Sequence, residues 1–138
     1  MGYLHINVFA VLVAAALSFG LGALWYSPFL FAKQWMAAHG YTPEQVKAMQ
    51  AGSSKAYALS FACYLVMAAA LAVLINLTHV HGILGGIKLG LICWLGFAAT
   101  VSLTAHLFSG KRWPAFLIDA GYQLAALALI GLILGAWR

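Results

Sequence analysis

The sequence predicts an all-α integral membrane protein, a four-helix bundle with a short interfacial helix between spans one and two. Composition is the first reason, because 65% of the 138 residues are hydrophobic and 7% are charged, whereas soluble proteins carry about 25% charged residues. The second reason is that four apolar runs reach the ~20 residues that a helix needs to cross a bilayer. A soluble catalytic domain is excluded, because no stretch of the chain is polar enough to form its surface.

The four apolar runs are the predicted spans, and residues 1–138 are expected to form a single membrane domain. The runs cover residues 6–26, 57–77, 83–108 and 115–137. Short connections over residues 78–82 and 109–114 join the last three runs. Neighbouring helices joined by such short connections run antiparallel.

The connection between the first two spans is the longest, and its first half is amphipathic. Over residues 28–39, Phe29, Ala32 and Met36 fall on one side of a helix. Lys33 falls on the opposite side. A short helix with two such sides lies in the membrane interface, so we expect an interfacial helix here.

The second half of that connection carries a helix start signal. Thr42 suits the N-cap position, Pro43 the first helical position and Gln45 the third. We expect a helix that begins here and ends within the sequence AGSS at residues 51–54.

Basic residues indicate which side of the membrane each connection faces. Cytoplasmic loops carry an excess of Lys and Arg, and the long connection and the third loop together hold five of the seven. We therefore predict that these two loops are cytoplasmic and that both termini lie outside. The five are Lys33, Lys47, Lys55, Lys111 and Arg112, against Lys88 and Arg138 on the other side.

Tryptophans give a second indication of the span ends. Indole rings prefer the headgroup level of a membrane, and four of the five Trp residues fall at predicted span ends. We expect these four to contact membrane lipids at the interface. They are Trp25, Trp35, Trp113 and Trp137.

Asp119 is the most informative polar residue, because a carboxylate inside a bilayer is costly and often functional. It lies about one turn into the fourth span, near the level of Tyr and His side chains on the other spans. Two interpretations stay open. Asp119 either decorates a helix start, where the macrodipole favours an acid, or forms the centre of a ligand or proton site. The candidate ligand-binding residues are Asp119, Gln123, Tyr122, Tyr26, Tyr57, Tyr64 and His106.

Small residues at four-residue spacing form a third signal. Such faces let helices approach closely, and they occur in three of the four spans. They serve either packing within one chain or self-association, and we predict a homo-oligomer, with a membrane-protein partner as a further option. The helix-packing candidates are Gly82, Gly86, Gly90, Gly131 and Gly135.

Other chemistry has little support in the sequence. The seven Lys and Arg residues form no basic stripe, so nucleic acid is not an expected partner. The sequence contains no Ser/His/Asp order, no H-E-x-x-H and no C-x-x-C-H, so no specific catalytic motif is present. We therefore expect no cofactor and no metal, and we lean against an enzyme.

Three stretches carry a resemblance to a known family. They are GALWYSPFLF at residues 22–31, followed by Lys33 and Trp35, then WLGF at 94–97 and LIDAGY at 117–122. Together they resemble the family of small bacterial membrane proteins catalogued as domain of unknown function 1761. The resemblance implies a four-helix membrane domain in the bacterial inner membrane, and it implies no activity.

Three function classes follow from these observations. In the first, the protein binds or transports a small or lipophilic solute at Asp119, with the interfacial helix as a lid. In the second, the Gly-rich faces and that helix, acting as a packing collar, dock another membrane protein. In the third, which we favour least, His106 and Asp119 serve a membrane-embedded enzyme or haem protein.

Overall fold

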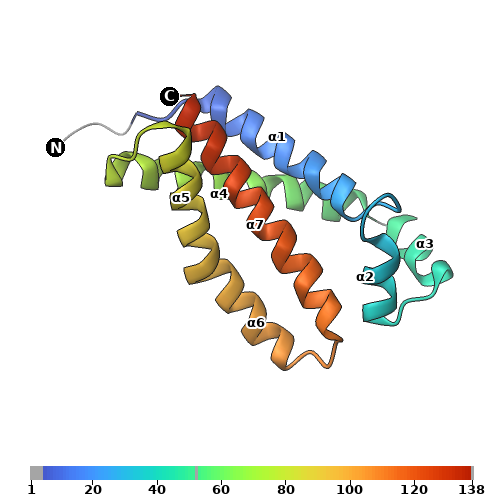
Figure 1. Cartoon of the computed structure of the whole chain (residues 1–138). Coiled ribbons are helices and arrows are strands. Elements are labelled where there is room, and N and C mark those ends of the chain that lie inside the picture. Colours follow the sequence, from blue (N-terminus) through green and yellow to red (C-terminus); the bar gives the residue numbers. More distant parts are fainter. Residues whose placement is uncertain (1–4, 52, 138) are drawn as a thin grey trace.

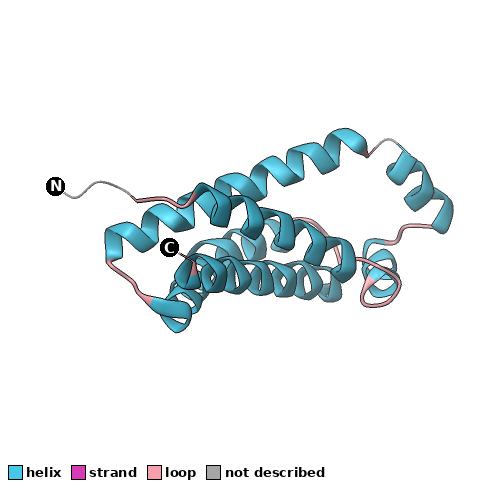
Figure 2. Ribbon diagram, turned by 90° about the horizontal axis from the view of Figure 1, so that it is seen from above, coloured by secondary structure: helices cyan, strands magenta, loops and turns pink. Residues whose placement is uncertain are grey.

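The computed structural model describes residues 5–51 and 53–137, and within these ranges every regular element is a helix (Figures 1 and 2). Four of the helices are long and apolar enough to cross a membrane. They are α1 (Val8–Trp25), α4 (Ser54–Thr78), the continuous helix Gly82–Leu107 and α7 (Trp113–Ala136). Arg138, counted above as a basic residue of the terminal side, lies outside the described residues.

The helix Gly82–Leu107 changes its winding in the middle, which the sequence analysis did not anticipate. It consists of α5 (Gly82–Cys93), a π-helical turn (Trp94–Ala98) and α6 (Ala99–Leu107). The Trp94 indole N–H within that turn donates to the carbonyl oxygen of Ala120 at 2.9 Å. A π-helical turn inserts extra backbone into a helix, and here it coincides with a hydrogen bond between α7 and the third long helix.

Two short helices fill the connection between α1 and α4. Helix α2 (Ala32–His39) begins four residues later than residue 28, the predicted start. The chain turns first, because the Ser27 carbonyl oxygen accepts from the Leu30 and Ala32 amides at 3.0 and 3.2 Å. Helix α2 ends at Gly40, whose φ of 75° suits a residue without a side chain.

Helix α3 (Pro43–Ala51) starts as predicted. The Thr42 amide donates to the Gln45 side-chain oxygen at 2.8 Å, and the Gln45 amide donates to the Thr42 hydroxyl oxygen at 3.2 Å. This reciprocal pair is a capping box, and it confirms the helix start expected from the sequence.

The closest helix contact joins α5 to α7 through glycines. A Cβ added at Gly86 would overlap the carbonyl oxygen of Gly131, and a Cβ at Gly90 would overlap that of Leu127. A Cβ at Gly135 would overlap the Gly82 carbonyl oxygen. The Gly faces of α5 and α7 therefore meet one another within the chain, which is the internal packing that the sequence analysis left open. The homo-oligomer stays a prediction.

Helices α1, α4 and α7 share a core near the end of the molecule where α1 begins and α7 ends (Figure 1). The side chains of this core are small or aliphatic, and in α4 all of the buried residues lie between Ala68 and Ile75. The N-terminal half of α4 is exposed or half-buried. The opposite end of α4 therefore packs less tightly against its neighbours. The core comprises Ala10, Val11, Ala14, Ala68, Leu71, Ala72, Ile75, Ile130, Ile133 and Leu134.

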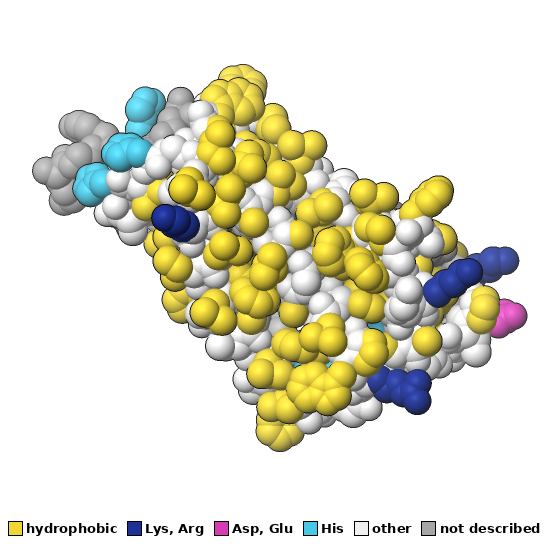
Figure 3. All heavy atoms as spheres, viewed as in Figure 1, with side chains coloured by type: hydrophobic (Ala, Val, Ile, Leu, Met, Phe, Trp, Pro, Cys, Tyr) yellow, Lys and Arg dark blue, Asp and Glu magenta, His cyan; other side chains and the backbone are white. Residues whose placement is uncertain are grey.

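The surface separates apolar from charged side chains. Figure 3 shows hydrophobic side chains over the middle of one face, with most of the visible Lys, Arg and acidic side chains at the end near α2 and α3. Large side chains such as Phe97 and Val66 are 70% and 69% exposed. Exposed apolar residues in the middle and charges at the ends are the distribution that a membrane-spanning protein needs.

Adding a methyl group at Gly86 tests the contact between α5 and α7. Because the neighbouring atoms belong to backbone, we expect Gly86→Ala to lower the free energy of unfolding by about 1–3 kcal/mol. The matched control is Gly20→Ala in α1, since a Cβ there meets nothing within 4 Å. Thermal unfolding in detergent, followed by far-UV circular dichroism, compares the two variants. Equal stability of both would contradict the packing described here.

Candidate functional site

A pocket of about 780 Å³ lies where the N-terminal half of α4 leaves its neighbours. Helices α1 and α4 form two of its walls, α2 and α3 form a third, and α7 contributes Asp119. The lining residues are Phe19, Gly22, Ala23, Tyr26, Pro28, Ala32, Trp35, Met36, Val46, Met49, Ser53, Ala56, Tyr57, Ser60, Tyr64 and Asp119.

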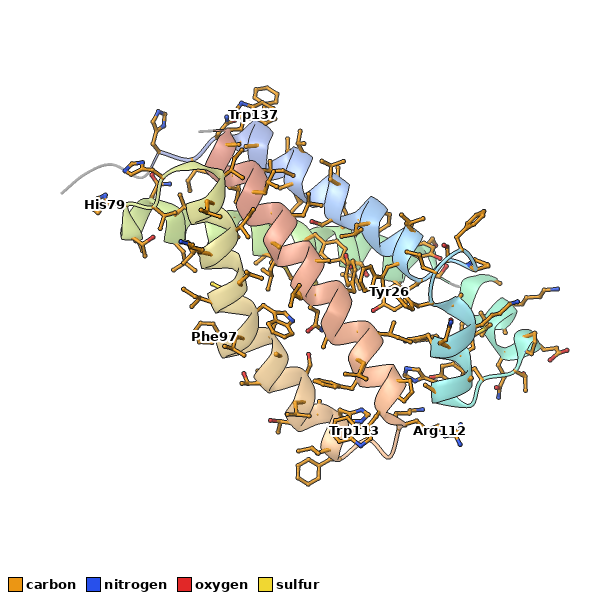
Figure 4. The ribbon with its side chains drawn as sticks, viewed as in Figure 1. Tyr26, His79, Phe97, Arg112, Trp113 and Trp137 are labelled. Atoms are coloured by element: carbon orange, nitrogen blue, oxygen red, sulfur yellow. The ribbon has the colours of Figure 1, made fainter. Side chains whose placement is uncertain are left out.

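The Asp119 carboxylate is held by a phenol. Tyr26 is the residue directly after α1 and is labelled in Figure 4. Its hydroxyl donates to Asp119 Oδ1 at 2.6 Å. Asp119 is also beyond the first turn of α7, which contains no acidic residue. Since the macrodipole acts mainly over the first turn, the hydrogen bond from Tyr26 is the closer interaction of this carboxylate.

A buried tyrosine, Tyr122, packs behind this pair. The Tyr122 hydroxyl donates to the Ser18 carbonyl oxygen at 2.7 Å, which fixes α7 against α1. The Tyr122 ring lies 5.6 Å from the Tyr26 ring and 6.1 Å from the Tyr64 ring. Tyr122 is buried and supports the pocket residues from behind, while Tyr26 and Tyr64 line the pocket.

Aromatic rings form two corners in the pocket wall. Tyr26 and Trp35 meet edge to face at 6.1 Å with an interplanar angle of 77°. Phe19 meets Tyr57 at 6.2 Å and Tyr64 at 6.3 Å in the same manner. Edge-to-face pairs are a favoured aromatic geometry, so the rings support one another while part of each faces the pocket.

Two residues expected near Asp119 lie elsewhere. Gln123 is one turn further along α7, but its long side chain reaches α6 and accepts from the Ser102 hydroxyl at 3.0 Å. His106 packs against Trp113 and Phe116 at 4.9 and 5.4 Å, because the short loop after α6 returns directly to the start of α7. Neither Gln123 nor His106 lines the pocket.

The tryptophans expected at the interface divide into two pairs. Trp113 and Trp137 are 55% and 45% exposed at the two ends of α7. Trp25 turns inward and donates its indole N–H to the Ile118 carbonyl oxygen at 2.9 Å. Trp35 lines the pocket. A span-end position alone does not distinguish an indole that faces lipid from one that packs inside.

The family comparison covers the elements that build this pocket. A family model described as "Protein of unknown function (DUF1761)" matches residues 9–135. The chain belongs to the DUF1761 family. The match takes in every pocket-lining residue, from Phe19 to Asp119. Neither the search of curated proteins nor the search of solved structures found a significant match.

Several pocket residues of this DUF1761 chain were not candidates from the sequence. Met36 comes from α2, and Val46 and Met49 come from α3. The only available signal was that the last two are apolar and three residues apart, which places them on one side of a helix. The sequence did not indicate that this side faces α1 and α4.

His39 connects α2 to the loop before α7. Its ring stacks on Tyr41 at 5.3 Å and lies tilted against Trp35 at 4.2 Å, and Lys111 Nζ lies 5.3 Å from the centre of the Tyr41 ring. Neither ring nitrogen of His39 has a hydrogen-bond partner in the described part of the chain. Burial, followed by the charge of Lys111, lowers the pKa of His39, while Asp119 acts in the opposite direction.

Removing the Tyr26 hydroxyl tests the pair with Asp119. We expect Tyr26→Phe to lower the free energy of unfolding by about 1.5–3 kcal/mol, the usual contribution of a hydrogen bond to a charged group. Tyr57→Phe is the control, because Tyr57 lines the same pocket and is 53% exposed. Chemical denaturation in detergent measures both. An effect of Tyr26→Phe that persists undiminished in an Asp119→Asn background would contradict the pairing.

Acidification tests the surroundings of His39. Its lowered pKa means that the unfolded chain, with a His pKa of about 6.5, binds the proton more readily than the folded chain. The contribution of His39 to stability is therefore complete above pH ~6.5 and declines as the pH falls below that value. Comparing unfolding of the wild type and His39→Phe at pH 7 and pH 5 isolates this contribution. Identical pH dependence in both proteins would contradict it.

Proposed function

We propose that this DUF1761 protein is a multi-pass protein of the bacterial inner membrane that binds a small lipophilic solute beside Asp119, as a step in sensing or transport. One observation carries the proposal. The pocket has a volume of about 780 Å³, within the ~300–1,000 Å³ typical of small-molecule sites. It is lined mainly by apolar and aromatic side chains with a few polar groups, which is also typical of such sites.

The position of the pocket supports a lipophilic rather than a fully hydrated solute. The α4 wall includes Ala56 and Tyr57, both exposed on the side of a helix that we propose to face lipid. Membrane lipids are therefore the expected surroundings of its opening. Since lipophilic solutes concentrate in the bilayer, an opening toward lipid gives them direct access to Asp119.

The proposed orientation places the pocket near the cytoplasmic face. The end of the molecule with α2, α3 and the loop before α7 carries five of the seven Lys and Arg residues, which is the cytoplasmic preference of basic loops. Both termini would then lie outside.

Reporter fusions test that orientation. A reporter that is active only in the periplasm, fused after Arg138, is expected to be active. The same reporter inserted between α2 and α3, at Gly40, is expected to be inactive. The reverse pattern would overturn the proposed topology.

No contact in the described part of the chain specifically favours the two other function classes, an assembly partner and an enzyme or haem protein. The Gly faces proposed to dock a partner meet one another between α5 and α7. His106, which the enzyme or haem class would use together with Asp119, packs against Trp113. A homo-oligomer and a membrane-protein partner remain predictions from the sequence.

Filling the pocket tests solute binding. We expect Ala56→Trp to reduce photolabelling of the pocket by a neutral alkyl diazirine about tenfold, which corresponds to a loss of about 1.4 kcal/mol in binding. Ala62→Trp is the matched control, since Ala62 is an exposed alanine of the same helix and does not line the pocket. Mass spectrometry locates the labelled residues. Equal pocket labelling in both variants would overturn the proposed function.

A further inference from the structure

Building on the proposed function, we propose that the solute is a lipophilic organic cation, with its positive group between the Asp119 carboxylate and the aromatic corner of Tyr26 and Trp35. The inference depends on the pocket described above and specifies the chemistry that it selects. Three features carry it: the charge of the lining, the arrangement of the rings and the apolar remainder of the walls.

The charge of the pocket has one sign. Asp119 supplies the only formally charged side chain among the residues that line the pocket. Its partner Tyr26 is a neutral donor, so the hydrogen bond leaves the negative charge uncompensated. An ionised carboxylate offers about four acceptor positions, and Tyr26 occupies one of them. A cationic group is the complement to this site, and an anion is disfavoured.

The aromatic rings provide the second requirement for an organic cation. A cation within about 6 Å of a ring centre is attracted by the negative face of the ring, and aromatic cages use this to recognise quaternary ammonium groups. Tyr26 and Trp35 stand at 77° to one another beside the carboxylate. Two rings at such an angle present surfaces from two directions to a single group. A hard metal ion would instead require about six oxygen ligands.

The rest of the pocket suits an apolar body attached to that cation. Away from Asp119, the walls contain Met36, Val46 and Met49 together with alanines. Methionine side chains are flexible and adapt to irregular apolar shapes. A volume of about 780 Å³ leaves room for a body considerably larger than the charged group.

The lysines near the pocket do not cancel this preference. Lys33, Lys47 and Lys55 are exposed, and they do not line the pocket. Lys111 is half-buried over the Tyr41 ring, and it does not line the pocket either. Charges in water are screened over about 10 Å at 0.1 M salt. Asp119 acts inside a largely apolar pocket, where electrostatic interactions are stronger than in water.

Two ions of the same size and shape but opposite charge test the inference directly. Tetraphenylphosphonium is the cation and tetraphenylborate is the anion. Binding of each is measured by equilibrium dialysis with the full-length protein in lipid nanodiscs, with empty nanodiscs subtracted. We expect saturable binding of the cation, with the anion at least about tenfold weaker.

Two variants locate the bound cation. We expect Asp119→Asn to weaken cation binding about tenfold. Trp35→Leu keeps the carboxylate and removes one ring, so it is expected to weaken cation binding about fivefold. If Asp119→Asn fails to fold, the Trp35→Leu variant alone tests whether the cation binds at this site. Trp113→Leu, an exposed tryptophan that does not line the pocket, is the control. Cation binding unchanged by Trp35→Leu, or by a folded Asp119→Asn, overturns the inference.

The lipid composition of the nanodiscs separates two sources of the cation. If the ammonium headgroup of phosphatidylethanolamine occupies the site, adding this lipid to phosphatidylglycerol nanodiscs weakens tetraphenylphosphonium binding. If a free organic cation is the ligand, the added lipid has no effect. Either source of the cation is consistent with the inference only if tetraphenylphosphonium binds more tightly than tetraphenylborate.

Failure of this inference is distinguishable from failure of solute binding. Equal binding of both ions, lost in Ala56→Trp, overturns cation selectivity and retains a lipophilic binding site. Binding of neither ion, combined with pocket labelling by the neutral diazirine that Ala56→Trp abolishes, also overturns selectivity alone. Absence of ion binding together with absence of pocket labelling overturns both proposals.

Discussion

Contact between the backbones of α5 and α7 constrains the rest of the structure. Gly86 and Gly131 leave no space for a Cβ on either helix, so the two helices meet at one end of the molecule. The remaining sides of α7 are then available to α1, α2 and α4 (Figure 1). Because α7 contacts each of these helices, a carboxylate on its other half can face residues that come from distant parts of the chain.

The Asp119 carboxylate shows how such a packed helix accommodates a polar group. Its partner is the Tyr26 phenol, which satisfies a hydrogen-bond acceptor without neutralising the charge. The backbone of α7 on either side of Asp119 is also held by side chains of neighbouring helices, since the Ile118 and Ala120 carbonyl oxygens accept from the indole N–H groups of Trp25 and Trp94. The carboxylate is therefore fixed in position.

The sequence predicted the features that depend on local pattern. Apolar run lengths indicated four long helices, and Thr42 with Gln45 indicated the start of α3. Features that depend on how a helix is rotated against its neighbours were not predictable in this way. Gln123 shares a side of α7 with Asp119 but reaches α6, and small residues fit either an internal or an external contact.

Beyond Tyr26, the connection between α1 and α4 supplies a further seven of the sixteen residues that line the pocket, from Pro28 to Ser53. These residues contribute little to the core, which lies at the other end of the molecule. Substitutions in this connection therefore change the shape of the pocket while leaving the packing of α1, α4 and α7 intact. Descendants of one ancestral chain can diverge in what they recognise by altering this segment alone, with the same long helices as a shared scaffold.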